Sequence, residues 1–296
     1  MQLKIKNSKP KKSLGQNFLT SVGAVEKIIE TAAYASKFRD FPEVGPPKSG
    51  GRTSDNITIL EVGPGRGVLT EALLKKFHKV IAIEKDDQLF AELSKKFSGE
   101  INSQQLRLVS GDILELDARE LGLLNGDYGV VANIPYYITG QFLRTWLETE
   151  VPPKFMVLML QKEVAKRIVA KDGKESLLSI SIKAYGKPKY VETVKRGSFY
   201  PIPNVDSAIL LIDHISKLFF DHLGVQHPSK IRRGIFFDLL KAGFSHKRKL
   251  LIRNLEEKLK DKEKLQKTFK ICNLDIKIRA EDIKTEDWIC LSDKLF

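Results

Sequence analysis

A short sequence with an amide, a proline and an aromatic ring, Asn133-Ile134-Pro135-Tyr136, follows an apolar run over residues 128–132. The run is typical of a buried strand, so these four residues would lie where the strand ends. Together they could hold a flat base by its exocyclic amine. Asparagine and proline are also ordinary turn residues, so this stretch alone favours a functional site no more than a turn.

The chemistry that these residues suit is methyl transfer to N6 of adenine. The N6 lone pair is delocalised into the ring, and hydrogen bonds that accept both N–H protons direct it outward. The Asn133 side-chain oxygen and the Ile134 carbonyl could accept them, and Pro135 would fix the turn. Tyr136 could stack on a flipped-out base, with Phe199 as the candidate for the second face. We expect alignment to supply the catalysis, without a metal or a covalent intermediate.

A glycine-rich turn over residues 61–67 offers a site for the second reactant. Gly63 and Gly65 would let the backbone approach a ligand, and the next helix would direct its free N–H groups toward it. Glu84 ends the following predicted strand and could accept ribose hydroxyls, while Asp112 could accept an adenine amine. The turn alone also permits a dinucleotide dehydrogenase. Acids after three successive strands, with the downstream amide, favour S-adenosylmethionine.

The hydrophobic pattern predicts an α/β fold. Strands are expected over 57–62, 80–84, 106–109, 128–132 and 155–160, and helices over 22–35, 67–77, 87–97 and 140–148. This alternation predicts a mostly parallel, doubly wound, Rossmann-like methyltransferase sheet. Two later runs, 190–194 and 208–212, predict an antiparallel strand pair at its edge.

The C-terminal part of the chain has a different pattern. Residues 229–269 are charged and helical in period, with Phe236, Leu239, Leu240, Leu251 and Leu255 as core candidates. We therefore expect two domains, a methyltransferase domain over 1–213 and a small helical, basic RNA-binding domain over 214–296. Residues 38–56, rich in proline and glycine, predict a surface loop, and a tolerated insertion is the simplest interpretation.

Composition restricts the class of protein. No apolar stretch reaches the roughly 18 residues of a membrane span, so we expect no membrane partner. Cys272 and Cys290 have no metal-site spacing, and we expect them to be reduced and to fill the core. The net charge of +13 is concentrated in two segments: residues 1–12 hold five lysines and no acid, and residues 230–270 hold 14 basic against five acidic residues. Such blocks indicate a polyanionic partner, and nucleic acid is the best candidate.

Together these motifs resemble the ribosomal RNA adenine dimethyltransferase family, which dimethylates two adjacent adenines in a loop near the 3′ end of small-subunit (16S) rRNA. The resemblance spans nearly the whole chain. It rests on residues 11–19, 61–70, 133–136, 161–165, 199–207 and 242–249.

The resemblance implies a role for each matching position. It implies that S-adenosylmethionine is bound by Asn17, Leu19, Gly63, Gly65, Glu84, Asp112 and Asn133. It implies that the catalytic residues are Asn133, Ile134, Pro135, Tyr136 and Phe199. The expected RNA-binding residues are Lys11, Lys12, Arg232, Arg233, Lys247, Arg248 and Lys249. We further expect a cytoplasmic monomer that acts on small-subunit rRNA or an immature 30S particle and takes part in small-subunit biogenesis.

Three alternatives remain open at this point. A sister family that methylates an adenine of large-subunit rRNA and confers macrolide resistance shares the core motifs. A non-catalytic ribosome assembly factor could bind immature subunits through Lys247, Arg248 and Lys249. A dehydrogenase would bind a nicotinamide cofactor, but no histidine or lysine is placed to favour it.

Overall fold

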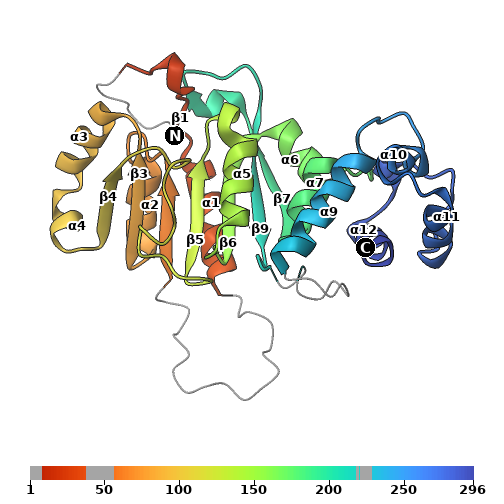
Figure 1. Cartoon of the computed structure of the whole chain (residues 1–296). Coiled ribbons are helices and arrows are strands. Elements are labelled where there is room, and N and C mark those ends of the chain that lie inside the picture. The colour runs from red at the N-terminus through yellow and green to blue at the C-terminus, as the bar shows by residue number, and fades with distance from the viewer. Residues whose placement is uncertain (1–8, 38–56, 218–219, 221–228) are drawn as a thin grey trace. The chain divides into compact units, whose positions relative to one another are not determined.

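The computed structural model describes residues 9–37, 57–217, 220 and 229–296, and it divides into two compact units (Figure 1). The first unit, residues 1–165 and 189–215, is built on a sheet. Its strands are β2 Thr58–Val62, β3 Lys79–Glu84, β4 Leu106–Ser110, β5 Tyr128–Asn133, β6 Phe155–Gln161, β7 Lys187–Val194 and β9 Ser207–Asp213. They lie in the order β4-β3-β2-β5-β6-β9-β7, parallel from β4 to β6 and antiparallel between β6 and β9. The predicted doubly wound, Rossmann-like sheet is confirmed.

The strand order reverses between β2 and β5, and this switch point determines where a ligand can bind. After β2 the chain adds β3 and β4 on one side, then returns to place β5 and β6 on the other. Connecting segments that leave in opposite directions open a crevice at the carboxyl ends of the strands. Because β2, β3 and β5 pair in parallel, Gly63, Glu84 and Asn133 reach the same edge of the sheet.

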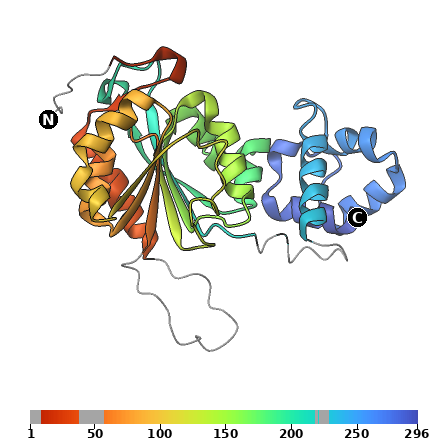
Figure 2. The ribbon, with the colours of Figure 1, turned by 60° about the vertical axis from the view of Figure 1, so that its left-hand side comes forward.

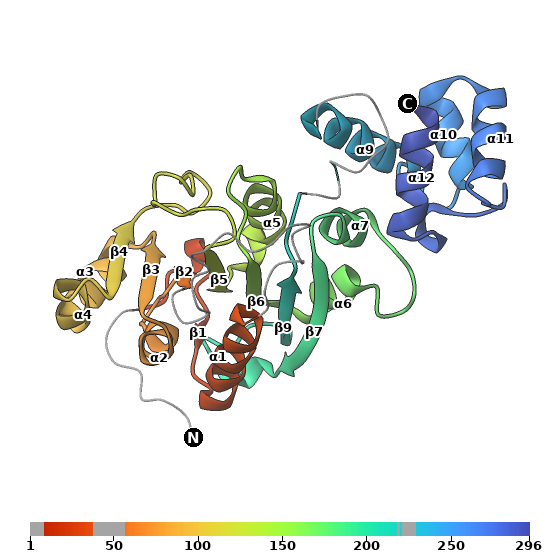
Figure 3. The same cartoon turned by 90° about the horizontal axis from the view of Figure 1, so that it is seen from below.

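Helices cover both faces of this sheet (Figure 2). They are α1 Val22–Ser36, α2 Val68–Lys76, α3 Asp87–Lys96, α4 Ser98–Asn102, α5 Thr139–Glu148 and α6 Lys162–Val169. Figure 3 shows α1 and α2 on one face and α5 on the other. On the first face Ile28, Leu73 and Val131 belong to one buried cluster. On the second, Trp146 packs edge-on against Tyr128, with the ring centroids 6.4 Å apart. The central strands are therefore buried on both sides, which explains their continuous apolar sequences.

An N-terminal strap, residues 9–20, crosses the carboxyl edge of the sheet. It contains the 3-10 helix η1 Lys12–Leu14 and the short strand β1 Phe18–Leu19. β1 pairs antiparallel with β8 Phe199–Tyr200, so that Phe18 faces Tyr200 and Leu19 faces Phe199. The sequence pattern did not predict this pairing, because strands of two residues carry no detectable period.

The second unit, residues 166–188 and 216–296, is helical. Its helices are α7 Leu177–Lys183, α9 Ser229–Gly243, α10 Leu251–Leu259, α11 Lys262–Ile271 and α12 Thr285–Leu295. The five predicted core residues, Phe236, Leu239, Leu240, Leu251 and Leu255, are all buried. The unit also takes in residues 166–188, which the sequence analysis placed in the first domain. The Glu175 N–H donates to the Glu281 carbonyl at 2.8 Å, which ties this segment to the C-terminal helices.

The prediction that both cysteines are reduced core residues was wrong. Cys272 and Cys290 form a disulfide between the end of α11 and α12, with Cα atoms 5.8 Å apart. That separation suits a disulfide, and it arises from the packing of two helices. The two cysteines are separated by 18 residues, which matches no recognisable cysteine pattern, so their pairing was not predictable from their spacing.

Two other expectations were a surface loop at residues 38–56 and the absence of a membrane-spanning segment. The predicted surface loop at 38–56 lies outside the described residues. Within the residues that are described, none of the helices combines the length and the apolar character needed to cross a membrane.

A glycine inside β5 yields a testable consequence of the strand packing. Gly129 lies opposite Phe155 of β6, and a Cβ at Gly129 would lie 2.2 Å from the buried Phe155 ring. Gly129→Ala should therefore lower the free energy of unfolding by about 1–3 kcal/mol in chemical denaturation, because the ring must move within a packed core. Gly140→Ala, on the exposed start of α5 where a Cβ meets nothing within 4 Å, is the matched control. Equal stability of the two variants would contradict this packing.

Candidate active site at the carboxyl edge of the sheet

A cavity of about 260 Å³ opens at the carboxyl edge of the parallel strands. Its walls come from the strap, the turn after β2, the end of β3 and the loops after β4 and β5. Nine of the predicted cofactor and catalytic residues line it: Asn17, Gly63, Glu84, Asp112, Asn133, Ile134, Pro135, Tyr136 and Phe199. Residues far apart in the sequence are thus gathered around one cavity.

Two predicted cofactor residues, Leu19 and Gly65, do not line the cavity. Leu19 is buried in the core, and its backbone belongs to β1. The Gly65 N–H donates to Glu84 Oε2 at 3.0 Å, so this glycine acts on the site through the carboxylate.

The three glycines of the turn have different surroundings. All have positive φ, which favours glycine: +66° at Gly63, +58° at Gly65 and +72° at Gly67. A Cβ at Gly63 would meet nothing within 4 Å, so it would project into space that a ligand could fill. A Cβ at Gly65 would press on the Phe18 ring at 3.0 Å, and one at Gly67 would lie 2.5 Å from Phe97.

Glu84 is held by backbone donors at the bottom of the cavity. Its Oε1 accepts from the Asp86 N–H at 2.9 Å, and its Oε2 accepts from Gly65. Burial nevertheless raises the pKa of Glu84, against these hydrogen bonds. A rigid carboxylate with both oxygens oriented is suited to accept a pair of neighbouring hydroxyl groups.

Asp112 carries an ion pair that the sequence analysis did not foresee. Lys85 Nζ lies 2.5 Å from Asp112 Oδ2, and the Leu114 N–H donates to Oδ1 at 3.0 Å. Burial acts to raise the pKa of Asp112, but the Lys85 hydrogen bond and charge outweigh it and the pKa is lowered. An amine that binds Asp112 Oδ2 must therefore share this oxygen with Lys85 or displace the Lys85 ammonium group.

The amide of Asn133 is oriented by the strap. Its Nδ2 donates to the Asn17 backbone carbonyl at 3.0 Å. Because a carbonyl can only accept, this bond fixes which end of the amide faces the strap and leaves Oδ1 as its acceptor. The Ile134 N–H donates to the Met159 carbonyl of β6 at 3.2 Å, so the next peptide is fixed as well.

Two aromatic side chains from distant segments complete the cavity. Tyr136 begins the 3-10 helix η3 Tyr136–Ile138, and its hydroxyl lies 2.8 Å from Ser207 Oγ. Burial raises the pKa of the Tyr136 hydroxyl, so it stays protonated. Phe199 comes from β8 and is 3% exposed, with its backbone paired to the strap.

The chain matches the family described as ribosomal RNA adenine dimethylase over residues 7–295. A protein named ribosomal RNA small subunit methyltransferase A from Dehalococcoides mccartyi is 40% identical over 290 residues, covering 96% of this chain and 88% of the relative. A protein of the same name from Fusobacterium nucleatum is 36% identical over 283 residues, covering 95% and 96%. The chain belongs to the ribosomal RNA adenine dimethylase family.

Two solved structures have a fold similar to that of this chain. The dimethyladenosine transferase from Plasmodium falciparum has a TM-score of 0.70 at 25% identity, covering 93% of this chain and 95% of that one. The 23S rRNA methyltransferase ErmE has a TM-score of 0.68 at 22% identity, covering 94% and 99%, and this likeness concerns the fold alone. Membership of the family makes the chain an S-adenosylmethionine-dependent adenine dimethyltransferase.

The residues of the cavity fit this cofactor. Gly63 leaves open space at the turn, Glu84 presents an oriented carboxylate, and Asp112 presents a second one at the next strand end. These are the donor and acceptor types that a methionine moiety, a ribose and an adenine require. Family membership and this donor set argue against the dehydrogenase alternative.

The predicted RNA-binding residues differ in their contacts. Lys247 and Arg248 are exposed in a turn after α9, held by Asn254, whose Nδ2 donates to the carbonyls of Gly243 (2.6 Å) and His246 (3.1 Å). Three other predicted RNA-binding residues are already engaged. Lys249 pairs with Glu257 at 2.6 Å, Arg232 donates to the Phe220 carbonyl at 3.2 Å, and Lys11 pairs with Asp86 at 2.7 Å. Arg233 is half-buried on α9, and the side chain of Lys12 lies outside the described residues.

Glu61, the acid of the glycine turn, does not line the cavity. It is 1% exposed, and burial raises its pKa to about 8, with a further rise from the charge of Glu84 and opposition from Thr70 and Lys96. Glu61 therefore holds its proton at neutral pH and is a neutral core group beneath the turn.

The pKa of Glu61 predicts a pH effect on stability. The folded chain keeps a proton that the unfolded chain loses near the ordinary pKa of 4.5, so stability should fall as the pH rises from 4.5 to about 8 and then level off. Glu61→Gln removes the titrating group, and the difference between the wild-type and variant unfolding free energies should change across this window in denaturant titrations. A constant difference would contradict a raised pKa.

Proposed function

We propose that this enzyme dimethylates N6 of two adjacent adenines in a loop near the 3′ end of 16S rRNA. The substrate would be small-subunit rRNA or an immature 30S particle. We further propose that the enzyme is a cytoplasmic monomer that takes part in small-subunit biogenesis. The names of the relatives support a small-subunit substrate over the large-subunit alternative. The observation that carries the proposal is the oriented Asn133 amide beside the cofactor cavity.

The chain's own groups would activate the amine by alignment. Asn133 Oδ1 and the Ile134 carbonyl each accept one N–H of adenine N6, which directs the nitrogen lone pair away from the ring. S-adenosylmethionine, when bound, supplies an electrophilic methyl group. Each transfer would leave S-adenosylhomocysteine and release one proton from N6 to water. After the first transfer the amine keeps a single N–H, which either acceptor can hold, so the same pair serves the second transfer. Alignment of this kind accounts for catalysis without a charged base.

The base would lie between Tyr136 and Phe199. The hydrogen bond from Tyr136 to Ser207 and the pairing of β8 with the strap fix these rings before the base arrives. Fixed rings reduce the entropy lost on binding, and stacking offsets the unstacking of the flipped adenine.

The decisive experiment is methyl transfer from labelled S-adenosylmethionine to undermethylated small subunits, with large subunits in parallel. Nucleoside analysis should find N6,N6-dimethyladenosine in the small subunit only. Asn133→Ala should abolish the product while leaving small-subunit binding nearly intact, because the amide acts on the amine and not on the RNA backbone.

Each other outcome has a specific meaning. Label in large subunits would assign the enzyme to the large-subunit reaction. Equal loss of binding and methylation in Asn133→Ala would remove the catalytic role of the amide. Binding of small subunits and cofactor without any transfer would leave the assembly-factor function.

The second unit would contribute the main RNA-binding surface. Lys247 and Arg248 are exposed, and no ion pair involves them among the described residues. Unpaired cations release counterions when they contact phosphates, whereas Lys249 is already neutralised by Glu257.

Salt dependence tests this surface. Arg248→Ala should reduce the slope of log affinity for small subunits against log salt by about 0.7–0.9, the contribution of one phosphate contact. Lys79→Ala removes the same charge at the start of β3, the strand end opposite the cavity, and should leave the slope unchanged. Filter binding over a range of salt concentrations measures both. Equal slopes would exclude Arg248 from the RNA contact.

A further inference from the structure

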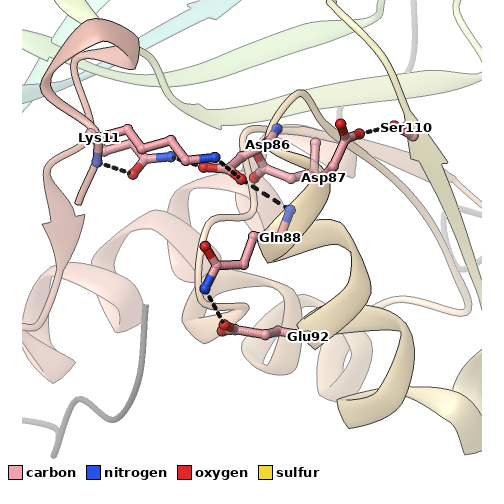
Figure 4. Close-up of polar contacts among 8 residues, drawn as sticks. Lys11, Asp86, Asp87, Gln88, Glu92 and Ser110 are labelled. Carbon is pink, nitrogen blue, oxygen red and sulfur yellow. Dashed lines mark hydrogen bonds and ion pairs between the residues drawn. The ribbon is translucent and has the colours of Figure 1, made fainter. Parts of the chain in front are cut away.

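Asp86, at the start of α3, joins the strap to the sheet. Figure 4 shows Lys11 extending from the strap to this side chain. Asp86 Oδ1 accepts from Lys11 Nζ at 2.7 Å and from the Gln88 N–H at 3.1 Å, while Oδ2 accepts from Gln16 Nε2 at 2.9 Å. Gln16 Oε1 in turn accepts from the backbone N–H of Lys11 at 2.8 Å, so the three residues form a closed set of hydrogen bonds. We call Lys11, Gln16 and Asp86 the clasp.

The clasp is built from a buried charge. Asp86 is 4% exposed, so its carboxylate depends on these partners in place of water. Burial acts to raise the pKa of Asp86, but the hydrogen bonds from Lys11, Gln16 and Gln88 outweigh it, and the pKa is lowered. Asp86 also caps α3 and donates its own N–H to Glu84, which connects the clasp to the floor of the cavity.

The strap that the clasp holds is the segment that orients Asn133. Gln16 is followed directly by Asn17, whose carbonyl accepts from Asn133 Nδ2. Beyond Asn17, Phe18 and Leu19 pair with β8. The strap is therefore fixed on both sides of Asn17, by the clasp before it and by the β1–β8 pairing after it.

We propose that Asp86 is a positioning residue for methyl transfer, which closes the strap over the cofactor cavity through Lys11 and Gln16 and so fixes the Asn17 carbonyl that orients Asn133. The proposal rests on the role of Asn133 in the proposed function. It gives Lys11 a structural partner, whereas the sequence analysis expected Lys11 to bind RNA.

The two roles of Lys11 predict opposite effects at Asp86. If Lys11 only contacted RNA, removing the Asp86 charge would strengthen RNA binding, because a nearby negative charge repels phosphates. If the clasp positions the strap, the same change weakens cofactor binding and catalysis. In Asp86→Asn an amide nitrogen would face Gln16 Nε2, two donors that cannot bond, while asparagine still caps α3.

The test combines four variants with one control. Lys11→Met, Asp86→Asn and the double variant remove the clasp, and Lys11→Arg retains its charge. Asp87→Asn makes the same chemical change at the next residue, whose carboxylate contacts Ser110 and not the strap. For each protein, calorimetry without RNA gives the dissociation constant of S-adenosylmethionine, thermal unfolding gives Tm, and methylation of small subunits gives kcat and KM.

The clasp predicts a specific pattern. Lys11→Met and Asp86→Asn should each weaken cofactor binding by roughly fivefold, the effect of losing one charge-assisted hydrogen bond at a partly exposed site. Both should lower kcat with little change in KM for the subunit. The double variant should be no worse than the more impaired single variant, because the two residues act as one unit. Lys11→Arg and Asp87→Asn should resemble the wild type, and every variant should remain folded at the assay temperature although loss of a partner of the buried Asp86 lowers Tm.

Other results would overturn the proposal. Unchanged cofactor affinity in Lys11→Met and Asp86→Asn would show that the clasp does not hold the strap in the position that cofactor binding requires. A higher subunit KM in Lys11→Met with a lower one in Asp86→Asn would assign Lys11 to the RNA. Additive losses in the double variant would make the residues independent. The cofactor measurements need no RNA, so they decide on the clasp even if small subunits prove not to be the substrate.

Discussion

The parallel, in-register pairing of β3, β2 and β5 is the constraint on which the site depends. It brings the carboxyl ends of three strands to one edge, so that Gly63, Glu84 and Asn133 meet although they are far apart in the chain. Because the side-chain period of a strand is two, a slip of one residue would turn Glu84 or Asn133 to the other face. The buried apolar faces of these strands fix the register, and the core thereby determines the geometry of the chemistry.

The second requirement is a cover for that edge. An open crevice would leave the Asn133 amide free to rotate in water, and alignment would be lost. The strap supplies the missing partner, a backbone carbonyl, and it is itself held by β8 and by Asp86. Arg66 adds a contact from the glycine turn, with its guanidinium 4.4 Å from the centre of the Phe18 ring. Several moderate interactions thus position one amide, which suits a segment that must also admit a cofactor.

The buried carboxyl groups around the glycine turn are stabilised in different ways. Glu84 and Asp86 are supplied with donors, whereas Glu61 has its pKa raised to about 8 and stays protonated. Two ionised carboxylates close together in a core would repel each other, and the charge of Glu84 is accordingly one of the causes that raise the pKa of Glu61. The three glycines of the same turn also serve different purposes. Gly63 leaves room for a ligand, while Gly65 and Gly67 allow Phe18 and Phe97 to pack closely.

The sequence by itself determined the strand–helix alternation, the acids and amide at strand ends and the family resemblance, because these depend on local periodicity and on short motifs. It also indicated the helical core of the second unit through residues such as Phe236 and Leu255. Only the tertiary structure decided the pairing of β1 with β8, the clasp at Asp86, the Lys85–Asp112 pair and the Cys272–Cys290 disulfide. Each of these four contacts joins residues that are far apart in the chain and belong to no common periodic pattern. Their proximity follows from how the elements pack, which hydrophobic pattern alone cannot specify.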